Sequence, residues 1–353
     1  MNSKAKILIL SNMYPSDKNV YYGIFVKNNY LGISKDFDTH IIYITYHNYY
    51  FLKLFNYFLF FIKSYFALFK YYDLVYIHFP SRSFFPLLLH PFRKKIRFVL
   101  NFHGSDLIND KLINKFIIDF LKPFFKNSLL IIVPSNYYKN LYVKNFPNCN
   151  IFVSPSSGVP DYFYDYKNKN NNYKNYLVYV SSITSEKGIF DLCESAILLK
   201  NHGLIFQLHI YGEGSKSNIK KLMNYINQLN GYLFYYGAIH REELPKILSN
   251  YKILIFPTVK INESLGLIGI EALSCNLPVI GSDNLALQSY LTDNYNSLIF
   301  KQGDINDLFN KILLLLNDPS IYHKIKQNTR YSVLKYKESI VFSNLNTKIR
   351  ELV

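Results

Sequence analysis

The sequence predicts an α/β protein with two doubly wound parallel-sheet domains. Three observations support this prediction: short apolar runs alternate with helical patterns along the chain, a polar tract interrupts them at Lys167–Asn175, and glycines or polar residues end several apolar runs. Apolar runs of this length are typical of strands that a parallel sheet buries on both faces. The 353 residues are enough for two domains of ordinary size.

The first half of the chain alternates predicted strands with predicted helices. A helix is expected from Ile24 to Leu31, and an aromatic-rich helix over Tyr49–Phe69. Because each strand is short and apolar, we expect one parallel sheet. The predicted strands are Lys6–Leu10, His40–Thr45, Asp73–His78, Arg97–Asn101, Leu129–Val133 and Asn150–Val153.

The alternation restarts after the polar tract. Helices are expected over Phe190–Lys200, Glu242–Ser249 and Asp304–Asp318, and the last segment is also expected to be helical. We therefore assign residues 1–165 to the first domain, 166–335 to the second, and 336–353 to a C-terminal helix that returns to the first domain. The predicted strands are Tyr176–Ser181, Phe206–Tyr211, Leu233–Tyr236, Ile253–Phe256 and Pro278–Gly281.

The charge balance predicts an anionic partner. The chain carries 40 Lys and Arg against 24 Asp and Glu, a formal net charge of +16. No zinc-finger spacing, RNP string or basic region with heptads is present in the sequence, so we favour a pyrophosphate substrate and an anionic membrane surface over nucleic acid.

The three cysteines have neither metal-ligand nor disulfide spacing, and the polar start indicates no signal peptide. We expect a cytoplasmic protein, peripheral on the inner face of the cell membrane.

The segment Tyr49–Phe69 is the one candidate for membrane contact. A helix that spans a bilayer needs about 20 apolar residues with few charges, and Lys53 and Lys63 interrupt this segment. Two interpretations remain open: a core helix of the first domain, or an interfacial helix lying on a membrane. Both can hold, one for each face of the helix.

The most specific motif in the chain surrounds two carboxylates. Glu263 and Glu271 lie eight positions apart, on either side of a turn at Gly266, directly after an apolar strand. The N-terminus of a helix presents unpaired backbone N–H groups that suit a phosphate, and a carboxylate accepts hydrogen bonds from sugar hydroxyls. With Ala272 and Pro278 in place, the string resembles the Glu-x7-Glu signature of retaining glycosyltransferases of the GT4 family.

This resemblance implies the GT-B fold, in which two Rossmann-like domains face a central cleft. The C-terminal domain would bind a nucleoside-diphosphate sugar and the N-terminal domain the acceptor. Glu263 would contact the donor sugar or face the reaction centre, and Glu271 would hydrogen-bond the ribose. The backbone at Leu265, Gly266 and Leu267 would contact the phosphate or the sugar.

A second motif runs from Ser182 to Gly188; it follows a predicted strand and opens a helix. A lysine in a loop that ends in glycine can bring an ammonium group and backbone N–H groups to a pyrophosphate. Lys187 and Gly188 match the family pattern, so the resemblance implies that Lys187 holds the diphosphate. Ser182 stands where the family has an arginine, and a hydroxyl does not replace a bidentate guanidinium. Which cation replaces that arginine stays open.

Further strand ends supply the remaining candidates. The string from His103 to Asp106 resembles the His-Gly-x-Asp element of the family, with His103 as a catalytic residue and Asp106 on the acceptor side. Gly23 starts a predicted helix where its backbone can approach the diphosphate, and Tyr14 precedes it on the acceptor side. Gly212 follows another strand and is expected to line the nucleotide pocket.

The resemblance therefore implies a retaining hexosyltransferase that moves a sugar from a nucleoside-diphosphate donor to a hydroxyl of a lipid-linked cell-surface glycan. No Asp-x-Asp string follows the N-terminal strands, and the resemblance likewise implies transfer without a metal or other cofactor. Two alternatives remain. Ser182 favours a catalytically degenerate accessory subunit of a glycosylation complex. The net charge alone would fit a basic protein that binds membranes or nucleic acid.

Overall fold

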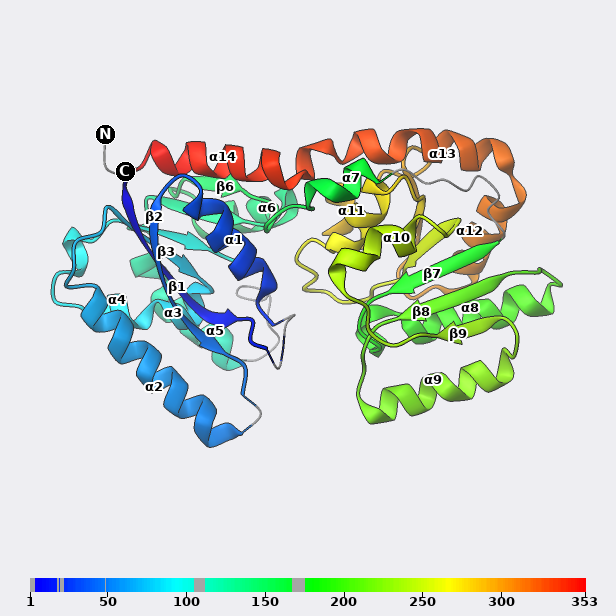
Figure 1. The fold of residues 1–353 in the computed structure, drawn as a ribbon, viewed down its shortest axis with the longest axis horizontal. Helices are drawn as coiled ribbons and strands as arrows, with labels where there is room; N and C mark the ends of the chain where they lie inside the picture. Colours follow the sequence, from blue (N-terminus) through cyan, green and yellow to red (C-terminus); the bar gives the residue numbers. More distant parts are fainter. Residues whose placement is uncertain (1–3, 18, 20–21, 48, 105–111, 167–174) are drawn as a thin grey trace. The chain divides into compact units, whose positions relative to one another are not determined.

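The computed structural model describes residues 4–17, 19, 22–47, 49–104, 112–166 and 175–353. The chain forms two compact units, which are shown in Figure 1. The first unit consists of Met1–Gly158 with Ser339–Val353, and the second is Val159–Glu338. The chain thus enters the second unit a few residues earlier than the expected boundary at residue 165, and it returns to the first unit at Ser339.

The first unit is built on a six-stranded parallel sheet in the order β2-β1-β3-β4-β5-β6. The strand order reverses between β1 and β3, so the loops that follow these two strands diverge, and ligands of such sheets bind at this position. The strands are β1 Lys6–Tyr14, β2 Asp38–Thr45, β3 Leu74–His78, β4 Phe98–Asn101, β5 Leu130–Val133 and β6 Ile151–Val153.

Helices cover both faces of this sheet. Helices α1 and α14 pack on one face, where the rings and methyl groups of Ile33, Phe342 and Leu345 join the core around Tyr76. Helices α2, α4, α5 and α6 pack on the other face. The helices are α1 Ile24–Ser34, α2 Tyr50–Ala67, α3 Pro80–Ser83, α4 Phe85–Leu88, α5 Leu112–Phe125, α6 Asn136–Asn145, α14 Glu338–Arg350 and the 3-10 helix η1 Arg93–Lys95.

The C-terminal helix α14 fits against α1 because Gly32 has no side chain. A Cβ atom at Gly32 would lie 2.3 Å from the ring of Phe342, which is buried at this position. The side chain of Asn346 donates to the carbonyl of Gly32, and Arg350 pairs with Asp36. These contacts make α14 part of the first unit, although its sequence follows the second.

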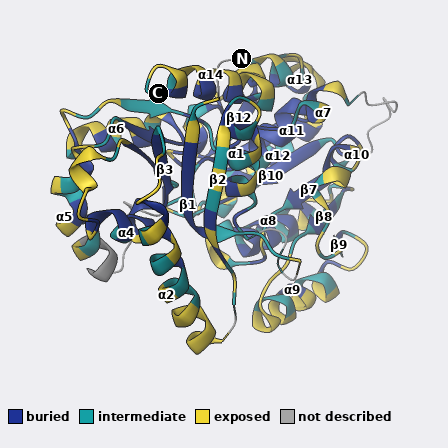
Figure 2. Ribbon diagram, turned by 60° about the vertical axis from the view of Figure 1, so that its left-hand side comes forward, coloured by how far each residue is buried: buried dark blue, intermediate teal, exposed yellow. Residues whose placement is uncertain are grey.

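Helix α2 presents two faces of different character. Phe60, Ser64 and Ala67 are buried against the sheet, whereas Phe51 is 79% and Phe58 59% exposed. Figure 2 shows the exposed outer side of this helix in yellow. Within the described residues, no helix has both the length and the apolar character needed to cross a bilayer. Helix α2 therefore contributes to the core on one side and leaves an aromatic surface on the other.

The second unit contains another six-stranded parallel sheet, in the order β12-β11-β10-β7-β8-β9. Its order reverses between β7 and β10, as in a dinucleotide-binding fold. The edge strand β12 was not predicted from the sequence. The strands are β7 Tyr176–Val180, β8 Gln207–Tyr211, β9 Leu233–Tyr235, β10 Ile253–Phe256, β11 Val279–Ser282 and β12 Ser297–Phe300.

Two helical layers enclose this sheet as well. Helices α8, α9, α12 and α13 share one core cluster with it, and α7, α10 and α11 share the other. Strands β10 and β11 are buried along their whole length, whereas β8 and β9 include half-buried residues. Figure 2 shows exposed residues on the outer sides of the helices. The helices are α7 Asp161–Asp165, α8 Ile189–Asn201, α9 Lys216–Gln228, α10 Leu244–Leu248, α11 Leu267–Ser274, α12 Ile305–Asn317, α13 Pro319–Ser332 and the 3-10 helices η2 Ser185–Lys187, η3 Arg241–Glu243, η4 Leu287–Ser289 and η5 Leu334–Tyr336.

Candidate active site

The loop after β7 is held tightly against the end of β10. Gly188 adopts φ +71°, and a Cβ atom there would lie 1.8 Å from the carbonyl oxygen of Pro257. The backbone N–H of Val259 also donates to the carbonyl of Glu186 at 2.9 Å. Only glycine fits this left-handed position in such close contact. The loop thereby holds Lys187 beside the residues that follow β10.

Lys187 and Glu263 form an ion pair at the switch point of the second sheet, where the strand order reverses between β7 and β10. Lys187 Nζ lies 2.5 Å from Glu263 Oε2, and the two side chains are 18% and 9% exposed. The hydroxyl of Thr258 donates to the same carboxylate oxygen at 3.3 Å. An ammonium group has three N–H donors, so Lys187 can hold Glu263 and still bind an anion. The structure thus brings together two residues that the sequence singled out separately.

Gly266 sets the start of helix α11. It adopts φ +71°, and a Cβ atom there would lie 2.6 Å from Phe256 and 2.7 Å from Leu287. Its carbonyl accepts a hydrogen bond from Tyr290 at 2.8 Å, which fixes the turn. Leu265 is buried, so its backbone rather than its side chain is suited to contact a ligand. Leu267 is the first residue of α11, where backbone N–H groups lack helical partners.

Glu271 is held by an arginine that the sequence did not single out. Arg241 donates to Glu271 Oε1 from Nε at 3.1 Å and from Nη2 at 2.7 Å. The Glu271 side chain is 7% exposed and that of Arg241 is 21% exposed. Arg241 lies in the short helix η3, which follows β9 along the chain. A buried carboxylate needs such a partner, so the pair fixes the carboxylate that the resemblance assigns to the ribose.

Gly212 connects the loops after β7, β8 and β9. It adopts φ +145°, and a Cβ atom there would lie 1.8 Å from the carbonyl oxygen of Ser181. Its N–H donates to Gly237 at 2.8 Å, and its carbonyl accepts from Tyr235 at 2.9 Å. Ser182, next to this contact, is exposed, and its carbonyl accepts from the Tyr179 hydroxyl at 2.9 Å. Gly212 is therefore a packing position that shapes the loop carrying Ser182.

In the first unit, His103 lies against a second histidine that sequence analysis missed. His78 Nδ1 and His103 Nε2 are 2.9 Å apart, and one of them donates to the other. Burial lowers the pKa of His103 to about 3. Burial, and repulsion from His103 whenever that ring is protonated, also hold the pKa of His78 well below its usual value. Both rings are therefore neutral near pH 7. The sequence indicated only that His78 ends a predicted strand. The position of that strand, β3, beside β4 comes from the sheet order.

Aromatic rings enclose His103. The rings of Phe25 and Phe79 lie 4.7 and 4.5 Å from its ring, centroid to centroid. Phe79 adopts φ +49° although it is not glycine, a strained conformation that is common at functional sites. Phe25 belongs to α1, so the helix that Gly23 starts and the strand end that carries His103 meet here.

Two further predicted residues of the first unit, Tyr14 and Gly23, lie at the end of β1 and in the loop that follows it. Gly23 adopts φ +73°, and a Cβ atom there would lie 2.9 Å from the backbone of Met13 and Tyr14. Tyr14 stacks on Tyr43 with ring centroids 4.0 Å apart, and burial raises the pKa of its hydroxyl. Asp106 lies outside the described residues, so its predicted place on the acceptor side stays a prediction.

The fold and the strand-end site define a protein of the GT-B type, with two Rossmann-like units. A family model described as "Glycosyl transferases group 1" matches residues 163–332, and one described as "Glycosyltransferase Family 4" matches residues 25–156. The two models together cover most of the chain, which therefore belongs to the glycosyltransferases of group 1 and family 4, as the resemblance predicted.

Individual relatives agree with this assignment. An uncharacterised glycosyltransferase of Methanocaldococcus jannaschii is 26% identical over 265 residues, 72% of this chain and 69% of that protein. The N,N'-diacetylbacillosaminyl-diphospho-undecaprenol alpha-1,3-N-acetylgalactosaminyltransferase of Campylobacter jejuni is 26% identical over 176 residues, 50% of this chain and 44% of that protein. The crystal structure of Anabaena HepE in complex with UDP-glucose covers 98% of this chain and 100% of its own, with a TM-score of 0.75 and 13% identity. The matches to the two relatives thus span 69% and 44% of those proteins, and HepE shares the fold.

Proposed function

We propose that the protein is a retaining glycosyltransferase, which moves a sugar from a nucleoside diphosphate to a hydroxyl of a lipid-linked cell-surface glycan. The observation that carries this proposal is the ion pair of Lys187 and Glu263 at the switch point of the second sheet. There an ammonium group, a carboxylate and the start of α11 lie together. The ammonium group and the backbone N–H groups at the start of α11 can bind a diphosphate and stabilise the negative charge that develops on it during transfer. The carboxylate can accept hydrogen bonds from sugar hydroxyls.

In the proposed mechanism the second unit binds the donor. Lys187 and the N–H groups at the start of α11 stabilise the leaving diphosphate, and Glu263 orients the sugar. Glu271, fixed by Arg241, hydrogen-bonds the ribose. The donor phosphate removes the proton of the incoming hydroxyl on the same face of the sugar, so the anomeric configuration is retained. We propose that no metal is needed, because Lys187 supplies a cation for the diphosphate.

The first unit is proposed to bind the acceptor. His103, neutral near pH 7, can donate one N–H to a hydroxyl or to developing negative charge. The name of the Campylobacter relative contains diphospho-undecaprenol, which supports a lipid-linked acceptor. Exposed aromatic residues of α2 suit a membrane interface, and the net charge of +16 suits an anionic one. We therefore propose a peripheral protein of the inner face of the cell membrane.

A screen of sugar nucleotides tests the proposal. The purified protein is tested for thermal stabilisation and slow hydrolysis with UDP-, GDP- and ADP-sugars, in the presence of EDTA. We expect one donor to stabilise the fold and to be hydrolysed, and Glu263→Gln to remove the hydrolysis. The anomeric configuration of the product, followed by NMR, tests retention. Loss of activity in EDTA, with recovery on adding Mg²⁺, would overturn the metal-independent mechanism.

Ser182 favours a second candidate, a degenerate accessory subunit. The side chain is exposed in the loop after β7, where the family has an arginine. A subunit of this kind would show neither thermal stabilisation nor hydrolysis with any of the donors. That result would replace the transferase proposal with a role in binding a partner or acceptor.

A further inference from the structure

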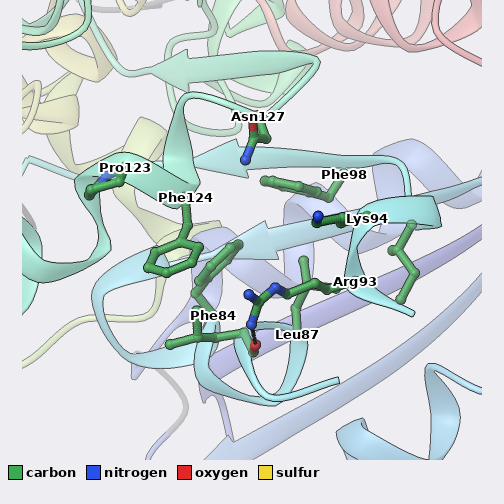
Figure 3. A pocket seen from close by; sticks show the side chains of 10 residues that line it. Phe84, Leu87, Arg93, Lys94, Phe98, Pro123, Phe124 and Asn127 are labelled. Carbon is green, nitrogen blue, oxygen red and sulfur yellow. Dashed lines mark hydrogen bonds between the residues drawn. The ribbon is translucent and has the colours of Figure 1, made fainter. Parts of the chain in front are cut away.

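A cavity of about 430 Å³ opens in the first unit, away from the strand ends described above. It lies between α4, η1, the start of β4 and the end of α5 (Figure 3). Phe98 at its wall is the first residue of β4, whereas His103 follows the other end of that strand. The cavity is thus at the opposite end of β4 from His103. Its volume is in the range of small-molecule pockets.

The inner wall of this cavity is apolar. Phe84, Leu87 and Phe98 line it and are at most 5% exposed. Figure 3 shows the rings of Phe84 and Phe124 on one side and that of Phe98 on the other. Such a wall offers no hydrogen-bond partners, so it suits a hydrocarbon chain better than a sugar or a nucleotide.

Cations stand at the mouth of the same cavity. Arg93 and Lys94 line it, and none of the described lining residues is acidic. Arg93 Nη1 donates to the carbonyl of Leu88 at 2.7 Å, and its guanidinium lies 5.4 Å from the centroid of Phe124. Both contacts fix the arginine and leave further N–H donors for an anion. Among the described residues, no carboxylate pairs with Arg93, Lys94 or Lys95.

The cavity continues into an exposed apolar surface. A neighbouring cavity of about 480 Å³ shares Arg93 and Lys94 and is also lined by Leu89, Phe92 and Lys95. Leu89 is 61% and Phe92 53% exposed. The Phe92 ring lies 6.2 Å from that of Phe69, just beyond the end of α2. Apolar side chains flanked by three consecutive cations are typical of a surface that meets an anionic bilayer.

We propose that this pocket binds one acidic phospholipid of the membrane, with an acyl chain against Phe84, Leu87 and Phe98 and the phosphate on Arg93 and Lys94. The combination of an apolar inner wall and a cationic mouth with no carboxylate partner among the described residues matches a single amphiphile better than a protein segment, which would need polar partners for its backbone. The inference rests on the membrane association proposed above and is independent of the transfer reaction.

A lipid that stays monomeric tests the pocket separately from the membrane surface. Binding of dihexanoyl phosphatidylglycerol below its micelle concentration is measured by titration calorimetry on the full chain. Dihexanoyl phosphatidylcholine and glycerol 1-phosphate serve as probes that lack the net charge and the chains, respectively. We expect saturable one-to-one binding of phosphatidylglycerol alone. Equal binding of the phosphatidylcholine, or binding of glycerol 1-phosphate at the same affinity, would overturn the proposal.

Two variants test separately the charge at the mouth of the pocket and the access to its interior. Lys94→Glu reverses a charge and is expected to weaken binding by ~10-fold or more, because it replaces a cation that attracts the lipid phosphate with an anion that repels it. Asn127→Trp places a bulky ring at the exposed rim and is expected to abolish binding without changing the charge. Lys324→Glu, an equal charge reversal on α13, is the control and should bind as wild type. Wild-type affinity in Asn127→Trp, with its melting temperature unchanged, contradicts binding in this pocket.

Vesicle flotation then separates this site from the surface of α2. If phosphatidylglycerol vesicles still capture Asn127→Trp while the monomeric lipid no longer binds, the membrane proposal stands and the pocket is an added site. If vesicles capture the wild type but the monomeric lipid never binds, the pocket proposal fails alone.

Discussion

Lys187 Nζ and Glu263 Oε2 lie 2.5 Å apart, although 76 residues separate them in the chain. Each follows one of the two adjacent strands, β7 and β10, at which the order of the second sheet reverses. The topology of the sheet therefore creates the pair. Because both side chains are largely buried, each charge depends on the other for its compensation.

The first prediction concerns this pair in catalysis. Lys187→Ala and Glu263→Ala are each expected to lower the rate of donor hydrolysis and transfer by ~100-fold or more, the size typical for loss of one group that stabilises the transition state. Single-turnover rates measure the effect, and melting temperatures show whether the variants fold. Wild-type rates in either folded variant would contradict the assignment.

Arg241 gives a prediction about stability. Arg241→Ala leaves the Glu271 carboxylate buried without its partner, so the free energy of unfolding should fall by about 3 kcal/mol. The double variant Arg241→Ala/Glu271→Gln removes the uncompensated charge and should recover part of that loss. Denaturant unfolding of the wild type, Arg241→Ala, Glu271→Gln and the double variant provides the measurement. Equal stability of Arg241→Ala and the double variant would show that the unpaired Glu271 charge is not the cause of the loss.

Gly188 offers a sharp test of the contact between the two loops. Gly188→Ala puts a methyl group on the carbonyl of Pro257 and also forces φ +71° on a residue with a side chain. Gly203→Ala is the matched control, because Gly203 has φ +82° but open space around it. The control should cost about 1–2 kcal/mol of unfolding free energy for the left-handed conformation. Gly188→Ala should cost at least ~1 kcal/mol more. Equal losses would mean that the loop relaxes away from β10.

How far the sequence predicted these features depends on the range of the signal. The alternation of apolar runs placed both sheets, and Glu263, Lys187 and Gly266 were found because they follow strands in a recognisable order. Arg241 was missed because its partner Glu271 is 30 residues away and only the fold brings them together. Strand β12 was missed because its four residues include one serine and follow a polar turn. His78 closes a strand, but its pairing with His103 needs the register of β3 with β4.

The two histidines predict a dependence of stability on pH. Burial lowers the folded-state pKa of His103 to about 3, below the value of about 6.5 in an unfolded chain. Between these values the unfolded state binds the additional proton, so stability is complete above pH ~6.5 and falls as the pH drops toward 3. Each such group contributes up to about 1.4 kcal/mol per pH unit. As the pH drops, the unfolding free energy of His103→Gln should therefore fall less steeply than that of the wild type. The control His323→Gln, at an exposed position, should have the same slope as the wild type. Identical slopes in all three proteins would contradict the lowered pKa of His103.

The last prediction concerns Ser182, where the family has an arginine. The loop backbone is fixed, because Tyr179 donates to the Ser182 carbonyl and Gly212 packs against Ser181, while the Ser182 side chain is exposed. Ser182→Arg should therefore fold normally and add a guanidinium group near the diphosphate proposed to lie on Lys187.

A hydrogen bond to a charged group contributes about 1.5–3 kcal/mol, so the Kd of the preferred nucleoside diphosphate should fall by ~10-fold or more. Ser185→Arg adds the same charge to the same loop at another exposed position and should bind as wild type. Titration of UDP, GDP and ADP against the three proteins makes the measurement. Binding that appears only in Ser182→Arg would identify the natural chain as the accessory subunit, because the missing arginine would then be what withholds the donor. Equal gains in both variants would reduce the effect to charge alone and remove Ser182 from the site.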